Sequence, residues 1–566
     1  MEHKKRKQQG FLQGAAILVA STVIVKIIGA VFKIPLSNLI GDLGFGYFSS
    51  AYDLFLPIYS LSMAGLPVAV SRMVAECIAT KKYKESRKVF KIAKIAFLVT
   101  GCAGFLIMLA AIYPFINITG SGNDSVYSML AIAPALLFCC IMSSYRGYYE
   151  GLRNMYPTAI SDVIEALGKL VIGYGLAFLV MRLTSNVAWA AAAAMLGITL
   201  GTVFGAAFLH IYYLKKGDSL TAEELELSPP SEDSRAILKA LVAIAVPVVL
   251  SSLATNIASM IDVTMVKWQL KNIMTDHADV VRAMYAESIA DYNAGAKTAL
   301  TDANIPTFLY GIRSKAYTLY NLMPTITSVL GVGAIPVLTT YWVQKDKLGV
   351  RRNIEMVVKT TAVVTMPVGF GMIAMSDEIM ELLYKSVAST QIGGPMLVLL
   401  GVATIFAGLT IPLTGMLQAI GRQMTPVKNI AVGAVIKIII NYIFVSIPSI
   451  NIHGAPLGTI GCYAYIFFAN FICLVKYSGV MPRLKKTILI PLLCGAICGA
   501  AAWGCNRVAS NLVSSAKITT LISIIFAGII YIISLIITRC IEKDDIFSLP
   551  NGEKVVKVLE KLKIIR

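Results

Sequence analysis

The sequence predicts an all-α polytopic membrane protein with about 14 transmembrane helices, built as two pseudo-symmetric six-helix lobes plus two extra C-terminal helices. Composition, apolar windows and an internal repeat predict this fold class. Of the 566 residues, 57% are hydrophobic and 14% are charged, whereas soluble domains are about half apolar and a quarter charged. Windows of roughly 20 apolar residues, each long enough to cross a hydrocarbon core of about 30 Å, recur along nearly the whole chain.

The apolar windows define the predicted spans in order along the chain. With approximate edges they are 11–40, 48–79, 90–117, 125–147, 157–182, 187–214, 236–265, 306–342, 353–384, 391–419, 427–448, 456–476, 486–506 and 517–540.

Two stretches, about 269 residues apart, resemble diverged copies of one another. The first is YYEGLRNMYPTAISDVIEALGKLVIGY, at 148–174, and the second is MLQAIGRQMTPVKNIAVGAVIKIIINY, at 416–442. Each has a Gly-containing turn with an Arg, then a Met-x-Pro and an apolar helix that holds one Lys; the pairs are Arg153 with Arg422 and Lys169 with Lys437. Such repeats are typical of transporters built from two lobes around a central site.

Lys and Arg gather at alternate ends of the spans, which predicts that both termini are cytoplasmic. The net charge of +19 is then mainly a topology signal and secondarily favours anionic lipid. Nucleic acid is excluded as a partner because the cations lie at span ends and form no single basic face. The apolar stretch after Gly10 is too long for a signal peptide, so we interpret it as an uncleaved first span.

The predicted domains are an N-lobe at 1–216, a linker at 217–235, a C-lobe at 236–480, two further helices at 481–540 and a cytoplasmic tail at 541–566. The linker is acidic and contains Pro and Ser, which predicts a solvated cytoplasmic segment. The tail has apolar residues at helical spacing with lysines between them, so it is an interfacial helix or an exposed tail. The outside segment 270–306 is a short amphipathic helix over the outer mouth or an ordered loop.

Motifs for catalysis, nucleotide binding or metal binding are not evident. The four histidines are far apart in sequence, the ten cysteines form no CxxC pair, and we find no Walker A loop, HExxH or strand-borne GxSxG. The sequence therefore predicts a protein that is not an enzyme and that has no metal or cofactor. Coupling to a sodium or proton gradient or to the membrane potential remains open.

Charged residues inside the spans are the best site candidates, because charge in a membrane is costly. Lys26 and Lys33 lie seven residues apart on one face of the first span. Lys26 is expected to face a hydrated cavity, while for Lys33 we leave open a structural role at the outer interface. The other candidate cations for a cargo are Arg72, Arg313 and Lys315, of which Arg72 is favoured as a surface ion pair with Glu76.

The two repeat lysines are deep as well. Glu165 precedes Lys169 by four residues, a spacing that lets the two charges partly neutralise each other. For Lys169 and Lys437 a buried structural pair is as plausible as contact with a cargo, and we assign them with Arg153, Glu165 and Arg422 to gate or structural roles. The surplus of cations inside the bundle favours an anionic cargo such as a phosphate or pyrophosphate group.

Several segments resemble a known family. They are RGYYEGLRNMYPTAISDVIEALGKL, GLPVAVSRMVAE, LIGDLGFGYFSSAYDLF and IEKDDIFSLPNGEKV. Together they are similar to the polysaccharide-export and stage V sporulation protein B branch of the multidrug/oligosaccharidyl-lipid/polysaccharide exporter superfamily, which is related to MurJ-like lipid II flippases.

The resemblance implies a flippase of the bacterial cytoplasmic membrane that moves an undecaprenyl-pyrophosphate-linked oligosaccharide by alternating access. Lipid II, or a related cell-wall or spore-cortex precursor, is the leading cargo, and membrane lipid and the cell-wall synthesis machinery are expected partners. Lys26 and Lys33 match the basic pair of the family's first helix, with Lys in place of Arg. One departure is Leu319, where MurJ-like proteins have an Arg five residues before the Pro that corresponds to Pro324.

Two alternatives are open. A cation-coupled multidrug exporter of the same superfamily would be expected to show acidic cavity residues. A membrane glycosyltransferase or polymerase would need an acidic catalytic residue outside; the candidates are Asp276, Asp279, Glu287, Asp291 and Asp302.

Overall fold

The computed structural model describes residues 11–540 except 64, 219 and 296–298. The basic N-terminal cluster Lys4–Lys7 and the predicted tail 541–566 lie outside the described residues. The described chain is helical and divides into two compact units. The first comprises Met1–Met274 and Ala296–Gly311, and the second comprises Thr275–Gly295 and Ile312–Arg566. The predicted lobe boundaries stay predictions.

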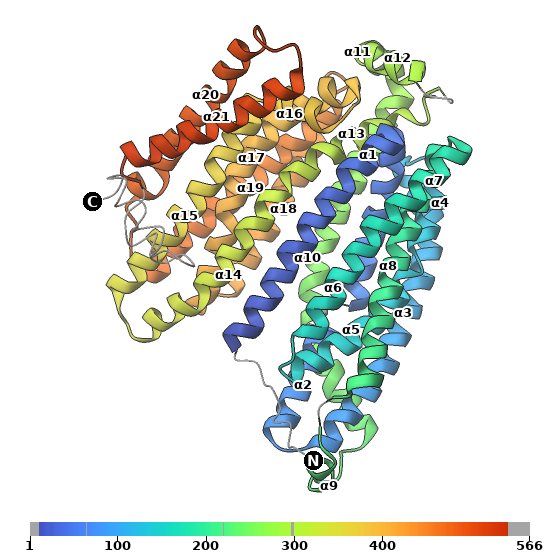
Figure 1. Ribbon diagram of the computed structural model, residues 1–566, viewed down its shortest axis with the longest axis vertical. Coiled ribbons are helices and arrows are strands. Elements are labelled where there is room, and N and C mark those ends of the chain that lie inside the picture. Colours follow the sequence, from blue (N-terminus) through green and yellow to red (C-terminus); the bar gives the residue numbers. More distant parts are fainter. Residues whose placement is uncertain (1–10, 64, 219, 296–298, 541–566) are drawn as a thin grey trace. The chain divides into compact units, whose positions relative to one another are not determined.

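The first unit contains ten α-helices and a π-helix (Figure 1). They are α1 (Phe11–Met63), α2 (Leu66–Ala79), α3 (Tyr83–Thr119), α4 (Ser125–Ile132), α5 (Ala135–Gly151), α6 (Tyr156–Gly168), the π-helix η1 (Lys169–Gly173), α7 (Tyr174–Thr184), α8 (Val187–Lys216), α9 (Ala222–Glu226) and α10 (Ser234–Asp276).

The remaining α-helices belong to the second unit, apart from the first residues of α13. They are α11 (Ala278–Met284), α12 (Ala286–Gly295), α13 (Ile305–Tyr320), α14 (Leu322–Val343), α15 (Lys347–Ala374), α16 (Ser376–Leu383), α17 (Val387–Ala419), α18 (Met424–Val445), α19 (Gly454–Ser478), α20 (Ile490–Ala509) and α21 (Ala516–Ile537).

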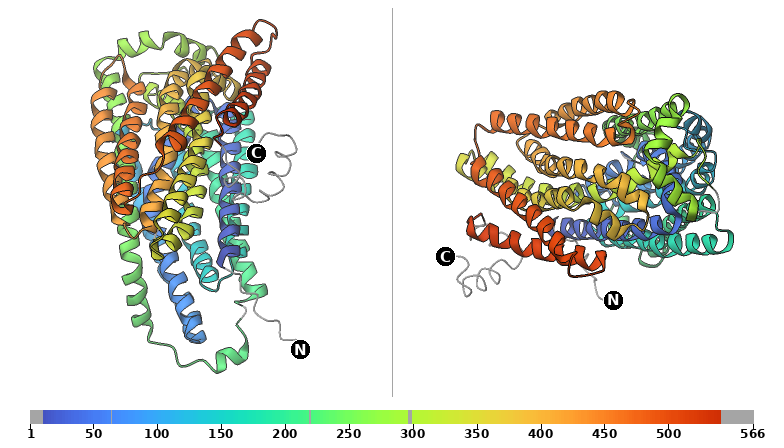
Figure 2. Two further views of the ribbon diagram at one scale, coloured as in Figure 1. Left: turned by 90° about the vertical axis from the view of Figure 1, so that its left-hand side faces the viewer. Right: turned by 90° about the horizontal axis from the view of Figure 1, so that it is seen from above.

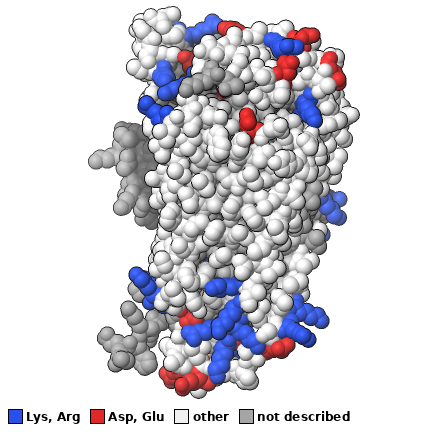
Figure 3. All heavy atoms as spheres, turned by 90° about the vertical axis from the view of Figure 1, so that its right-hand side faces the viewer, with Lys and Arg blue, Asp and Glu red and all other residues white. Residues whose placement is uncertain are grey.

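The predicted fold class is confirmed. Eleven helical runs in the described residues are long and apolar enough to cross a membrane. The first run divides at Gly41, and α10 and the α13–α14 pair add two more, which gives about 14 spans. On the face shown in Figure 3, charged side chains gather at two ends, and the band between them is almost free of charge, as a bilayer requires.

Gly41 shapes the part of α1 that carries the candidate site. Its φ of 69° and ψ of −173° interrupt the helix, and Gly adopts positive φ without steric cost. In an unbroken helix, Lys33 and Tyr52 would lie about 28 Å apart at 1.5 Å per residue. The Lys33 ammonium instead lies 5.7 Å from the centroid of the Tyr52 ring. The break therefore folds the first span back on the second.

The outside segment 270–306 contains short helices, in agreement with the helical one of the two predicted alternatives. The structure has α11 and α12 there, and α12 packs on α17. Tyr285 donates a hydrogen bond to Asn451 Oδ1 at 2.6 Å, and Ser288 donates one to Gln391 at 2.7 Å. The two extra C-terminal helices, α20 and α21, pack on each other, and α20 also packs on α15 (Figure 1).

Residues 217–233, here called the strap, connect α8 to α10 and cross the ends of the first unit's helices (Figure 2). The prediction of a solvated linker is wrong for its beginning, since Asp218 is only 4% exposed. Arg87 Nε and Nη2 donate to the two Asp218 carboxylate oxygens at 2.6 and 2.9 Å, and the Tyr148 hydroxyl donates at 2.9 Å. The sequence could not show these hydrogen bonds, because Arg87, Tyr148 and Asp218 lie far apart along the chain.

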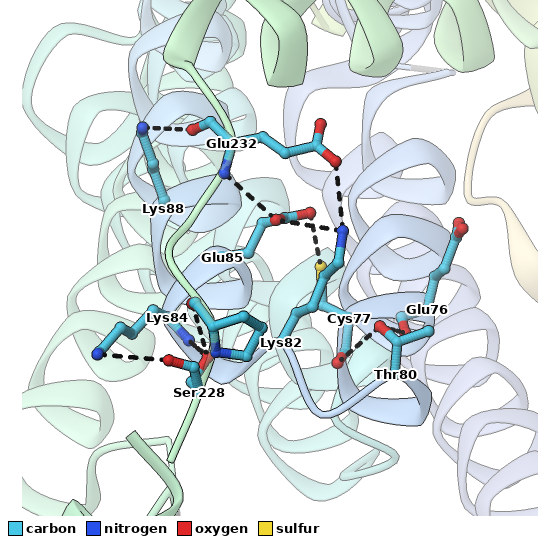
Figure 4. Close-up of polar contacts among 10 residues, drawn as sticks. Glu76, Cys77, Thr80, Lys82, Lys84, Glu85, Lys88, Ser228 and Glu232 are labelled. Atoms are coloured by element: carbon cyan, nitrogen blue, oxygen red, sulfur yellow. Dashed lines mark hydrogen bonds and ion pairs between the residues drawn. The ribbon is translucent and has the colours of Figure 1, made fainter. Parts of the chain in front are cut away.

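The other end of the strap lies on the basic turn between α2 and α3 (Figure 4). The Lys84 N–H donates to Ser228 Oγ at 3.0 Å. Glu232 pairs with Lys82 at 3.2 Å, and its carbonyl accepts from Lys88 at 2.5 Å. Exposed pairs of this kind contribute about 0–1 kcal/mol each, so the buried Asp218 is the main anchor of the strap.

Both repeat turns end their helices in the same way. After α5, the Asn154 N–H donates to Tyr149 O at 2.9 Å; after α17, the Arg422 N–H donates to Leu417 O at 2.9 Å. The left-handed residue is Arg153, with φ 58°, in the first turn and Gly421, with φ 79°, in the second. These bonds form a Schellman motif. The geometry thus matches Arg153 with Gly421, one position away from the sequence pairing with Arg422.

The two turns should respond oppositely to substitution at the left-handed position. Arg153→Gly should leave stability unchanged or raise it by up to about 1 kcal/mol, because Gly relieves left-handed strain, whereas Gly421→Ala should lower it by about 1 kcal/mol. Thermal unfolding of the detergent-solubilised protein measures both. Shifts of the same sign would contradict the shared motif.

Removing the charge of Asp218 should release the strap. Asp218→Asn should weaken the protection of the 217–233 amides against hydrogen exchange by on the order of 1 kcal/mol. The reason is that a partly exposed charged hydrogen bond to Arg87 is lost. Hydrogen exchange of these amides measures the loss. Glu226→Gln, which removes an exposed charge from the same segment, is the matched control and should leave the protection unchanged.

The protection of the wild-type strap should not change between about pH 5 and about pH 7. Burial raises the pKa of Asp218, but hydrogen bonds from Arg87, the Leu220 N–H and Tyr148 outweigh it and hold the pKa below the ordinary 3.8. A depressed carboxyl pKa stabilises the folded state above the unfolded pKa and loses that contribution only as pH falls through the folded one. Loss of protection at mildly acidic pH would contradict this assignment.

Candidate functional site

The candidate site in the first unit consists of Lys26, Lys33 and Lys169 around Tyr52, here called the lysine cluster. Lys33 is half-buried on α1, and its ammonium lies over the Tyr52 ring. Lys26, about two turns earlier on the same face of α1, is exposed. Both Lys26 and Lys169 lie near enough to repel the Lys33 ammonium electrostatically. The cluster thus gathers positive charge inside a membrane-spanning unit.

Lys169 also lies near Tyr52. It is the first residue of η1, and it is close enough to Tyr52 to interact with it electrostatically. Tyr52 therefore has the Lys33 ammonium over its ring and the lysine that begins η1 in its vicinity. Sequence reasoning missed Tyr52, because only the break at Gly41 brings the residue back toward Lys33.

The nearby carboxylates are engaged elsewhere. Asp53 accepts from Lys267 at 2.8 Å and from the Tyr310 hydroxyl at 2.7 Å. Lys267 is 3% exposed, so this is a buried ion pair between α1 and α10. Its partners were not predicted, because α10 extends beyond the expected edge of the seventh span and Lys267 lies in that extension.

Glu165 has a different main partner from the one its spacing suggested. Arg146 of α5 approaches Glu165 at 3.3 Å and Asp162 at 2.7 Å. Glu165 is still near enough to attract the Lys169 ammonium, as its spacing predicted, but it shares its carboxylate with a closer cation. Among the described residues, no carboxylate forms an ion pair with Lys26, Lys33 or Lys169, and the cluster keeps its positive charge.

The remaining cargo candidates lie elsewhere. Arg72 is exposed on α2. Arg313 and Lys315 are buried in the second unit, 4% and 1% exposed. The Arg313 guanidinium lies 4.1 Å from the Tyr317 ring centroid, while Lys315 donates to Ser389 Oγ at 3.0 Å. These two contacts join residues of that unit. A role of Arg72, Arg313 and Lys315 toward a cargo stays a prediction.

The gate candidates Arg153 and Arg422 lie in the turns of the two repeats, one position apart when the turns are matched by geometry. Arg153 and Arg422 are both exposed, and Arg422 lies over the Tyr477 ring at 4.3 Å. Lys437, like Lys169, is half-buried. Their role in a gate stays a prediction. In the described part of the chain, no three His, Cys, Asp or Glu side chains are grouped to hold a metal ion.

Comparison with known proteins gives consistent results. Residues 11–342 match the family described as polysaccharide biosynthesis protein, and residues 316–521 match the family of lipid II flippase MurJ. Lipid II flippase MurJ of Bacillus subtilis (strain 168) is 26% identical over 507 residues, which cover 87% of each chain. Stage V sporulation protein B of the same organism is 24% identical over 558 residues, 96% of this chain and 98% of that protein.

Solved structures show the same fold. Lipid II flippase MurJ in an inward closed conformation matches with a TM-score of 0.62 at 14% identity, over 92% of this chain and 98% of that one. An inward-facing multidrug resistance MATE transporter of the MOP superfamily matches with a TM-score of 0.59 at 16% identity, over 81% and 99%.

The described fold is of the same class as the folds of lipid II flippase MurJ and of the MATE transporters. Within that class, the chain belongs to the polysaccharide biosynthesis protein family, which matches more than half of its length.

Proposed function

We propose that this protein is a flippase that moves an undecaprenyl-pyrophosphate-linked oligosaccharide, lipid II or a related cell-wall or spore-cortex precursor, across the cytoplasmic membrane by alternating access. The observation that carries this proposal is the lysine cluster, in which three cations have no carboxylate partner among the described residues. A cation within a membrane-spanning segment that forms no ion pair must be offset by water or by a bound anion. A pyrophosphate headgroup supplies that anion through charge-assisted hydrogen bonds.

The relatives support the same cargo class. One is named as a lipid II flippase and another as a stage V sporulation protein. The MATE structural neighbours raise the multidrug exporter as an alternative, which would need free acidic residues for cationic drugs. In the first unit, Asp53, Asp162 and Glu165 are instead occupied by Lys267 and Arg146. The charge of the site thus favours an anionic cargo.

Replacing either lysine of α1 should slow translocation. Lys26→Ala and Lys33→Gln should each reduce the rate about tenfold or more, because one charged hydrogen bond to the headgroup contributes about 1.5–3 kcal/mol. The measurement is a leaflet assay with defined lipid-linked oligosaccharides in proteoliposomes. Lys91→Gln, which removes an exposed cation of α3, is the charge-matched control and should leave the rate unchanged.

Two results would contradict the proposal. One is a wild-type rate in both Lys26→Ala and Lys33→Gln. The other is wild-type protein that transports cationic dyes and leaves the lipid-linked sugar where it was, which would identify a multidrug exporter.

The membrane potential should assist this cargo. An inside-negative potential favours outward movement of an anionic headgroup by about 2.3 kcal/mol per charge per 100 mV. We propose that the potential alone can drive the reaction. A potassium diffusion potential imposed on proteoliposomes should accelerate outward translocation, and reversing its sign should slow it. A translocation rate that does not depend on the potential but depends on a sodium or proton gradient would contradict this proposal.

A further inference from the structure

An open groove lies between α3 and α10 of the first unit, near the ends that face outside on the predicted topology. Further toward the cytoplasm the two helices pack together, since Phe97 of α3 and Ala245 of α10 belong to one buried cluster. At the outer ends the Lys271 ammonium of α10 donates to Asn117 O of α3 at 2.7 Å. A Cβ added at Gly120 would lie only 3.0 Å from the Lys271 side chain. The groove is located between these two regions of contact.

The groove has a volume of about 420 Å³ and an almost wholly apolar lining, within the range of about 300–1,000 Å³ that is usual for ligand sites. The lining residues are one stripe of α10, Met260, Ile261, Thr264, Met265 and Trp268, with Ile118 of α3 opposite. Ile118 is 51% exposed and Ile261 is 46% exposed, so the groove is open. Lipid tails are as apolar as a Leu side chain, and an acyl chain therefore matches this lining.

The outer end of the groove carries the groups that a lipid headgroup needs. Trp268 is 39% exposed, and Trp residues of membrane proteins gather at the level of the headgroups. Lys271 follows it by three positions, on the same stripe of α10, and is exposed. A cation at the membrane surface attracts anionic lipid. No acidic side chain is among the described residues that line the groove.

The length of the groove fits one leaflet. From Lys271 to Met260 the helix rises about 16 Å at 1.5 Å per residue, which is about half of a hydrocarbon core of about 30 Å. A phosphate at Lys271 would thus place the acyl chains of the same lipid beside the lower lining residues. A polyprenyl chain is much longer than the groove, so the length favours an ordinary phospholipid.

We propose that this groove binds an anionic phospholipid of the outer leaflet. Its phosphate lies at Lys271, its glycerol backbone lies beside Trp268, and one acyl chain runs between Ile118 and Met260. The lipid fills the space where α3 and α10 separate, so it is a bound component of the first unit and differs from the cargo. The site shares no residue with the lysine cluster and goes beyond the proposed function.

The fluorescence of Trp268 tests the site. The chain has four Trp residues, and full-length protein with Trp189, Trp342 and Trp503 changed to Phe keeps only this indole. The protein is reconstituted in phosphatidylcholine vesicles that contain brominated phosphatidylglycerol or brominated phosphatidylcholine, whose bromine atoms quench a neighbouring indole. The ratio of quenching gives the relative affinity. Phosphatidylglycerol should be preferred about fivefold, the factor expected for one Lys near a membrane surface.

Three kinds of variant, made in the same background, separate the headgroup from the chain. Lys271→Gln should lower the ratio to about one, and Lys271→Arg should keep it. Lys239→Gln removes an exposed cation near the other end of α10 and is the matched control, with an unchanged ratio. Thr264→Phe should reduce quenching by both lipids, because the added ring fills the groove. Size-exclusion chromatography checks that each variant is folded.

Four results would overturn the inference. One is a ratio of one at Trp268 in the unsubstituted groove, and another is a preference that survives Lys271→Gln. A third is the same preference at Trp189 of α8, which stacks on Tyr127, because it would show a general enrichment of anionic lipid around the protein. The fourth is displacement of both brominated lipids by polyprenyl monophosphate at lower concentration than by phosphatidylglycerol, which would assign the groove to an isoprenoid chain.

Discussion

The cost of placing an ammonium group inside a membrane governs the arrangement of the first unit. Such a group needs a carboxylate, hydrogen-bond acceptors, an aromatic face, water or a bound anion. Lys267 satisfies this requirement fully through Asp53, Ser50 and the rings around it. Arg146 does so through two carboxylates. The lysine cluster meets this requirement only partly, through the aromatic face of Tyr52 beneath Lys33. The contrast within one unit separates cations that are paired with carboxylates from cations that are not.

The backbone creates this contrast as much as the side chains do. Gly41 breaks α1, so that the Tyr52 ring lies beneath the Lys33 ammonium, and the glycines of α8 let the wide turn η1 approach α8 closely. The strap adds a constraint at the ends of these helices, where Asp218 ties α3 and α5 to the segment that follows α8. The break at Gly41 and the glycines of α8 act on the backbone, whereas the strap acts through tertiary contacts of one carboxylate.

The span order, the repeat and the positive surplus could be predicted from the sequence, because they depend on composition and on local periodicity. The partners of individual charges could not. The i to i+4 spacing favoured Glu165 for Lys169, but Arg146 from another helix is the closer cation. Asp218 looked solvated in an acidic, Pro-containing segment, and its burial depends on Arg87 and Tyr148, which lie 131 and 70 residues away. Spacing reports neighbours on one helix, whereas tertiary packing determines which charge is nearest.

The first repeat widens into η1 at Lys169, whereas α18 of the second continues as a regular helix through Lys437. This difference follows from what stands opposite the glycines. In the first unit Gly168 faces Gly201 and Gly173 faces Gly197, so backbone meets backbone and a widened turn can fit. In the second unit, Gly458 and Gly461 face Asn441 and Ile440, whose side chains occupy that space. A regular helix is the conformation that fits there. A change of helical phase by one residue turns a side chain by about 100°, so a single π-turn is enough to direct a lysine toward a different neighbour. The residues opposite these glycines thus differ between the repeats in the same way as the helices around the two lysines, one widened and one regular.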